Sequence, residues 1–306
     1  MASDSIYRSA AGRELIRRWC GEQLDGWDVP HERTVVGANG AQTHVVSAGT
    51  GGTTVVFVPG TNFNAAASLP LATALVAAGH RVSLLDVPGQ PGLSSGDRNL
   101  AGGRLSWYGA WLDEVIDKTS PGPVVVMGHS FGAAIALSSA SRHIERLVLV
   151  SPGGLTGLRL PPGLLAASAA WFLRPTPRSS ARLLRAMLAP GHEPRERLVE
   201  WMTLVARHSR SSGAPGTADL PAKPVPRTVF TGGTRRVPPA GAARPGRDPH
   251  AGRRTAGTAR GRTPRGGGGP RPAGRPGRRR DVTARASGAC QRERRALLSR
   301  AARRVR

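Results

Sequence analysis

Short apolar runs alternate with helical stretches along the first 231 residues of the chain. The run at 123–127 is apolar throughout, as a strand buried on both faces requires. Behind Ser106, the residues Trp107, Trp111 and Val115 recur at four-residue steps, which predicts an amphipathic helix with Ser106 as its N-cap. The alternation predicts an α/β fold with a mostly parallel sheet flanked by helices. The predicted strands cover residues 40–47, 53–59, 80–85, 123–127, 146–151 and 227–231, and the predicted helices cover 69–78, 107–118 and 131–141.

A long insert separates the last two predicted strands. Residues 153–222 carry helical patterns broken by prolines, which indicates a helical cap over the strand ends. The patterns lie at 164–172, 178–188 and 195–208. We therefore expect an N-terminal helical extension at 1–32, a core at 33–152, the cap at 153–222, a last core strand within 223–233 and a tail at 234–306.

Positive charge is concentrated at the C-terminus. The chain has 44 Lys+Arg against 19 Asp+Glu, a formal net charge of +25, and residues 232–306 contribute +19 of it through 22 arginines and three acids. That segment has no aromatic residue and few large apolar ones. It cannot bury enough apolar surface to offset an ordering entropy of ~1–2 kcal/mol per residue, so we predict a disordered tail.

Several classes of protein are excluded. Cys20 and Cys290 are the only cysteines, too few for a disulfide framework. No apolar run reaches the ~18 residues that a membrane span needs, and the N-terminus has no apolar signal core, so we expect a cytoplasmic protein that does not enter the membrane. Histidine and cysteine are not clustered and no glycine loop suits a phosphate, so we expect neither a metal nor an organic cofactor.

The sequence Gly128-His129-Ser130-Phe131-Gly132 follows one predicted strand and opens the next predicted helix. This context is that of a G-x-S-x-G nucleophile elbow, a tight turn that projects a serine hydroxyl from the edge of the sheet. Residues two before and two after the serine crowd its backbone, and both are glycine here. The N-terminus of the helix adds partial positive charge that favours a nearby oxyanion.

Residues from about 33 to 233 resemble the α/β-hydrolase family. The resemblance is carried by the elbow, by the strand that ends in Pro59-Gly60-Thr61-Asn62, and by the turn Asp86-Val87-Pro88-Gly89-Gln90-Pro91-Gly92-Leu93-Ser94. The N-terminal segment and this turn are similar to those of bacterial carboxylesterase-like members. The resemblance implies a cap between the sixth and seventh strands and a Ser-His-Asp hydrolase of small-molecule esters or similar acyl compounds. A serine at the elbow disfavours haloalkane dehalogenases and epoxide hydrolases, which carry aspartate there.

The resemblance also implies roles for individual residues. Ser130 would be the nucleophile, with Gly128 and Gly132 shaping its turn, and the backbone N–H groups of Thr61 and Phe131 would form the oxyanion hole. Members of the family usually have His-Gly where this chain has Pro59-Gly60.

The turn that begins at Asp86 has an expected role of its own. We expect this aspartate to be structural, with Gly89 and Gly92 shaping a loop beside the site.

The rest of the triad is not recognisable. The family places its acid just after the seventh strand and its histidine after the eighth, whereas this chain continues with Thr234-Arg235-Arg236 and has no histidine after His250. Without a base, serine is a poor nucleophile at pH 7. Asp248 and His250 lie only two residues apart in a segment expected to be disordered, so neither is assigned, and the acid and base stay unknown. The other histidines are also left unassigned: His31, His44, His80, His129, His143, His192 and His208.

Three interpretations of the chain stay open. Because Arg, Gly, Pro and Ala are encoded by GC-rich codons, the first interpretation is that a frameshift near codons 231–236 replaced the native continuation, which resequencing of the locus tests. The second is a nucleic-acid binder that uses its tail to contact phosphates, although the tail lacks aromatic residues for base stacking. Incidental binding of nucleic acid through the basic tail is expected more than a selected nucleic-acid function. The third is a hydrolase-like scaffold that binds a ligand without turnover.

Overall fold

A computed structural model describes residues 5–97, 103–120, 122–155, 161–189, 191–210, 216–218 and 225–231, which belong to one unit of the chain. The expected disorder of the tail, and any contact that it makes with nucleic acid, concern residues outside this described part. Asp248 and His250 lie outside it as well.

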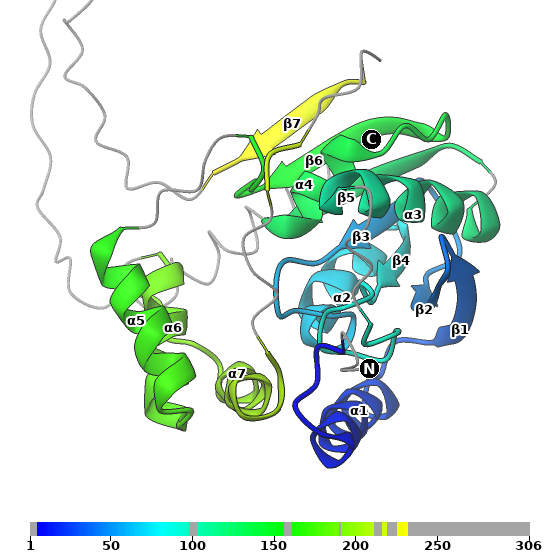
Figure 1. Cartoon of the computed structure of the whole chain (residues 1–306). Coiled ribbons are helices and arrows are strands. Elements are labelled where there is room, and N and C mark those ends of the chain that lie inside the picture. Colours follow the sequence, from blue (N-terminus) through cyan, green and yellow to red (C-terminus); the bar gives the residue numbers. More distant parts are fainter. Residues whose placement is uncertain are drawn as a thin grey trace, which may run out of the picture. The chain divides into compact units, whose positions relative to one another are not determined.

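The described strands form a single mixed sheet in the order β1-β2-β4-β3-β5-β6-β7 (Figure 1). The neighbours β4, β3, β5, β6 and β7 run parallel, whereas β2 pairs antiparallel with both β1 and β4. The predicted mostly parallel sheet is therefore confirmed. The strands are β1 (His31–Ala38), β2 (Ala41–Ala48), β3 (Thr54–Val58), β4 (Arg81–Leu85), β5 (Val124–His129), β6 (Ile144–Val150) and β7 (Arg227–Phe230).

Helices cover both faces of the sheet, because alternate residues of the central strands point to opposite sides. Val55 and Phe57 of β3 pack in one apolar cluster with α1 (Ala10–Asp25) and α2 (Leu69–Ala77), which is preceded by the 3-10 turn η1 (Ala66–Ser68). Val56 and Val58 pack in a second cluster with α3 (Arg104–Thr119) and α4 (Phe131–Ser138). Each face of β3 is covered by its own apolar cluster, and for this reason the side chains on both faces of the strand are apolar.

The segment between β6 and β7 forms the predicted helical cap. It consists of α5 (Pro162–Leu173), α6 (Pro177–Met187) and α7 (Glu196–His208). Helix α7 packs against α1, where the rings of Trp201 and Trp19 lie 4.6 Å apart (Figure 1). None of the helices in the described ranges is long and apolar enough to cross a membrane.

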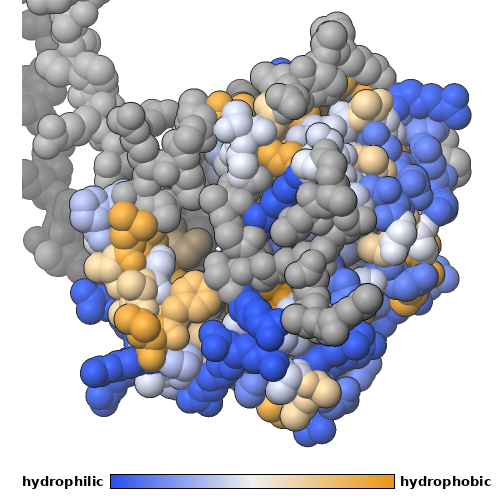
Figure 2. All heavy atoms as spheres, in the orientation of Figure 1, coloured by the Kyte–Doolittle hydropathy of each residue, from blue (hydrophilic) through white to orange (hydrophobic). Residues whose placement is uncertain are grey.

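Helix α5 leaves unusual apolar surface in contact with solvent. Its Leu165 is 52% exposed and its Leu173 is 81% exposed. Hydrophobic residues gather at the left of the molecular surface, where α5 and α6 lie (Figure 2). A helix that is apolar around its whole circumference is usually buried, so this face of the cap departs from the common pattern.

The sequence analysis missed one strand and misplaced the ends of two helices. Strand β1 was not predicted, because it lies at the edge of the sheet with most of its residues exposed and so shows no buried face in its sequence. Helix α3 begins at Arg104 behind Gly103, which has φ +100°, so Ser106 lies within the helix instead of capping it. Helix α4 ends at Ser138, three residues early, because the carboxylate of Asp113 accepts hydrogen bonds from the following Ser139 hydroxyl and from the backbone N–H groups after it.

Candidate active site

Ser130 stands at the turn between β5 and α4, in a backbone conformation that serine rarely adopts. Its φ is +51° and its ψ is −111°. The Ser130 N–H donates to the carbonyl of Val150 at 2.9 Å, and the Ser130 carbonyl accepts from the N–H of Gly153 at 3.1 Å. Such a conformation costs of order 1–3 kcal/mol and persists only where its surroundings enforce it. Here β6 and the loop that follows it provide that support.

The two glycines of the motif leave no room for a side chain. A Cβ on Gly128 would lie 2.6 Å from the Cα of Ala133. A Cβ on Gly132 would collide with the carbonyl oxygen of Val58 and lie 2.6 Å from that of Pro59. Helix α4 therefore starts in direct backbone contact with the end of β3.

The loop after β3 lies beside the serine. Val58 of β3 pairs with Gly128 of β5 in a parallel arrangement, so the loops that follow these two strands begin at the same edge of the sheet. A Cβ on Gly60 would lie only 3.2 Å from the Cβ of Ser130. The N–H groups of Thr61 and Phe131 flank this contact in sequence, and neither donates to a backbone carbonyl of the described residues. Two N–H groups so placed beside a serine could stabilise an oxyanion.

Side chains from two distant segments fix the loop after β3. Asn62 has φ +66°, in the left-handed region. Its N–H donates to Oε1 of Gln90 at 3.0 Å, and its carbonyl accepts from Nε1 of Trp201 at 2.8 Å. Sequence reasoning missed both positioning residues. Gln90 lies in a turn that the motifs did single out, but nothing in the sequence of the cap pointed to Trp201.

Asp86 has the structural role expected from the sequence. One carboxylate oxygen accepts from the N–H of Ala65 and the other from the N–H of Leu93, both at 2.7 Å. A Cβ on Gly92 would lie 2.9 Å from that second oxygen, so the close approach needs glycine. Asp86 thus ties the segment after β3 to the turn after β4, and its nearest imidazole is His44, at 3.5 Å.

Most of the described histidines are held far from Ser130 by the fold. His80 and His143 precede β4 and β6, at the amino edge of the parallel strands, whereas Ser130 follows β5 at the carboxyl edge. His44 lies on β2, three strands away from β5, which amounts to about 14 Å. His31 lies at the start of the edge strand β1, His192 lies between α6 and α7, and His208, at the end of α7, lies against Gly12 of α1.

His129 is the exception, because it directly precedes the serine. Its ring packs edge-on against Phe63, with centroids 6.2 Å apart. Burial lowers the pKa of the His129 imidazole below its usual 6.5, so the ring is neutral at pH 7. The ring is thus engaged with the loop after β3. No group of three or more potential metal ligands occurs in the described ranges.

Comparison with known proteins places this geometry in context. A family model described as "Alpha/beta hydrolase family" matches residues 55–297. The match extends beyond residue 233, where the sequence resemblance was expected to end, and it includes most of the arginine-rich segment. A search of curated proteins gave no match.

Solved structures share the fold at low sequence identity. A putative hydrolase from Bacillus subtilis has a TM-score of 0.58 at 17% identity, covering 73% of this chain and 76% of its own. Carboxylesterase CesB from Bacillus subtilis has a TM-score of 0.58 at 16% identity, covering 72% and 80%. Naproxen esterase from the same organism has a TM-score of 0.54 at 18% identity, covering 73% and 76%. Because the family model matches more than half of this chain, the chain belongs to the α/β-hydrolase family.

Proposed function

We propose that this member of the family is a serine hydrolase of carboxylic esters or similar acyl bonds, with Ser130 as its nucleophile. The observation that carries the proposal is the turn at Ser130, where a costly positive φ is enforced between two glycines that admit no side chain. An ordinary turn has no need of such a conformation, whereas a nucleophile elbow does. The solved carboxylesterases of the same fold agree with an ester as the substrate class.

The proposal gives a role to each part of the site. The hydroxyl of Ser130 attacks the acyl carbon, and the negative charge that develops on the acyl oxygen is received by the N–H groups of Thr61 and Phe131. Phe131 is the first residue of α4, so the positive end of the helix dipole adds to this stabilisation. Gln90 and Trp201 keep the Thr61 loop in place by holding Asn62.

We further propose that proton transfer is impaired in the chain as written. The reaction needs a base to accept the serine proton, and loss of that base costs about a million-fold in a serine protease. No distant histidine of the described part can reach Ser130, and His129 is packed on Phe63. A frameshift after β7 would explain the missing acid and base. The family model nevertheless matches up to residue 297, within the segment that such a frameshift would have replaced.

A ligand-binding scaffold is the second candidate, and the missing base is the observation that favours it. The two candidates differ in whether Ser130 can be acylated at all. A scaffold would hold an acyl compound near the free amides and release it unchanged.

Fluorophosphonate labelling separates these candidates. At pH 9 we expect slow addition of a single phosphonyl group, found by peptide mass spectrometry on the segment that contains Ser130. The Ser130→Ala variant should gain nothing, whereas the neighbouring Ser138→Ala variant should be labelled like the parent chain. Absence of label, or label spread over other serines, would argue against Ser130 as a nucleophile.

A further inference from the structure

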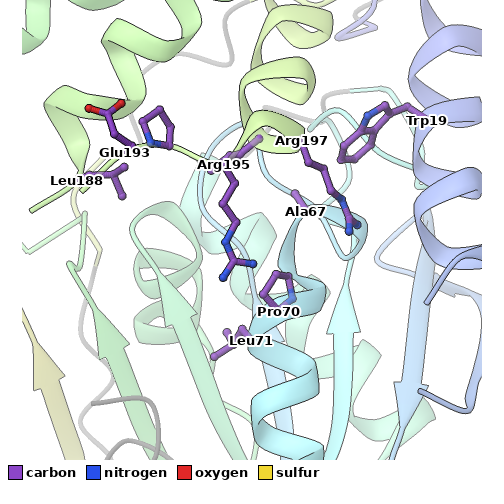
Figure 3. Close-up of a pocket in the computed structure, with 10 residues that line it drawn as sticks. Trp19, Ala67, Pro70, Leu71, Leu188, Glu193, Arg195 and Arg197 are labelled. Carbon is purple, nitrogen blue, oxygen red and sulfur yellow. The ribbon is translucent and has the colours of Figure 1, made fainter. Parts of the chain in front are cut away.

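A cavity of about 430 Å³ lies where the cap meets the core (Figure 3). It is formed by Trp19 of α1, Leu71 of α2, the connection between α6 and α7, and the first turn of α7. Its size is within the range of ~300–1,000 Å³ that is usual for small-molecule sites. Ser130 does not line this cavity, so the cavity is separate from the candidate active site.

Most of the cavity wall is apolar. Trp19 and Leu71 form the core side, and Leu188 and Leu198 contribute from the cap. Trp19 is itself anchored by its contact with Trp201. A hydrocarbon chain would therefore find apolar side chains from both the core and the cap.

Two arginines supply positive charge to the same cavity. The side chain of Arg195 extends across it toward Pro70 and Leu71, and Arg197 runs alongside (Figure 3). Arg197 donates to the carbonyl of Ala66 at 3.1 Å and lies over the ring of Trp19, 5.8 Å from its centroid. Neither guanidinium forms a salt bridge with a carboxylate of the described residues.

The one acidic residue of the cavity wall does not neutralise these arginines. The carboxylate of Glu193 points away from them (Figure 3) and accepts a hydrogen bond from Nε of Arg185 at 2.7 Å. Partial burial and the neighbouring charge of Arg195 lower the pKa of Arg197, and the carboxylate of Glu200, which acts in the opposite direction, does not outweigh them. Two like charges next to each other would be stabilised by an anion bound between them.

We propose that this cavity binds a single-chain amphiphile with a carboxylate head, such as a medium-chain fatty acid. The carboxylate would contact Arg195 and Arg197, and the hydrocarbon chain would lie against Trp19, Leu71 and Leu198. The site is independent of Ser130 and of the proposed hydrolysis.

Isothermal titration of the full chain with decanoate, below its micelle concentration, tests the proposal. We expect one bound decanoate per chain. Acetate, which lacks the hydrocarbon chain, and decyltrimethylammonium, which carries the opposite charge, should both bind much more weakly. The positive charge of the tail would attract an anion whether or not the anion carries a hydrocarbon chain. Acetate therefore also controls for nonspecific binding of anions by the tail.

Variants locate the binding site. The double variant Arg195→Gln/Arg197→Gln should weaken decanoate binding about ten- to a hundredfold, the range for lost charge-assisted hydrogen bonds. Leu71→Trp should weaken it by filling the cavity. Arg182→Gln removes an exposed arginine of α6 outside the cavity wall and should leave the affinity unchanged, as should Ser130→Ala.

Several results would overturn the proposal. These are no binding of decanoate, equal binding of decyltrimethylammonium, or an affinity that does not respond to the double variant. Loss of binding in Ser130→Ala would place the decanoate in the active site instead. Both substituted arginines are exposed, but Arg197 also contacts Ala66 and Trp19, so an unchanged thermal unfolding midpoint of the double variant is the control for an intact fold.

Discussion

Hydrolysis of p-nitrophenyl acyl esters by the full chain is expected to run several orders of magnitude below the ordinary enzyme range of ~1–10³ s⁻¹. The proposed oxyanion donors, the N–H groups of Thr61 and Phe131, do not depend on the missing base. Substrate binding and an oxyanion hole without a working triad give ~10³–10⁴-fold over water. Ser130→Ala should therefore cause little further loss of turnover. His250→Ala should cause none, because the account gives this histidine no part in proton transfer.

Steady-state kinetics on the three proteins checks this expectation. Turnover within the ordinary enzyme range that collapses in His250→Ala would mean that Asp248 and His250 form a working pair. The frameshift interpretation would then be wrong.

Replacing Gly132 with alanine should destabilise the fold by about 3 kcal/mol or more. The added Cβ would meet the backbone carbonyls of Val58 and Pro59, neither of which can move without shifting β3. The strained turn at Ser130 would also lose the close contact that supports it. Urea unfolding should show a lower midpoint for Gly132→Ala.

Gly21→Ala is the matched control for this variant. Gly21 lies within α1, and nothing lies within 4 Å of a Cβ placed there. Alanine in a helix interior is favoured over glycine by roughly 0.5–1 kcal/mol, so this variant should be slightly more stable than the parent chain. Equal midpoints for Gly132→Ala and the parent chain would show that α4 does not start in contact with β3.

The sheet could be predicted from sequence wherever its strands are buried on both faces. The apolar run in β5 has this character because two cores enclose it. Strand β1 could not be predicted, since an exposed edge strand needs no apolar periodicity and is defined by its pairing with β2. The early end of α4 was also hidden, because it depends on Asp113 from another helix.

The candidate site likewise combines a feature that a local motif reveals with contacts that no local motif marks. The turn at Ser130 could be predicted because two glycines and a serine at fixed spacing form a short motif, although Gly132 makes its close contacts with Val58 and Pro59, more than 70 residues away. Gln90 and Trp201 act on Asn62 from positions 28 and 139 residues away, so no local pattern marks them. The cavity beside Trp19 likewise combines α1, α2 and the cap, which only the folded chain brings together.

The pH dependence of kcat/KM for ester hydrolysis tests most directly whether Ser130 lacks an imidazole base. Without such a base the attacking species is generated by hydroxide, so we expect kcat/KM to rise about tenfold per pH unit from pH 6 to pH 9 with no plateau. A working histidine would instead give a rate that levels off above an apparent pKa near 6.5. A plateau of that kind would show that Ser130 has a working imidazole base.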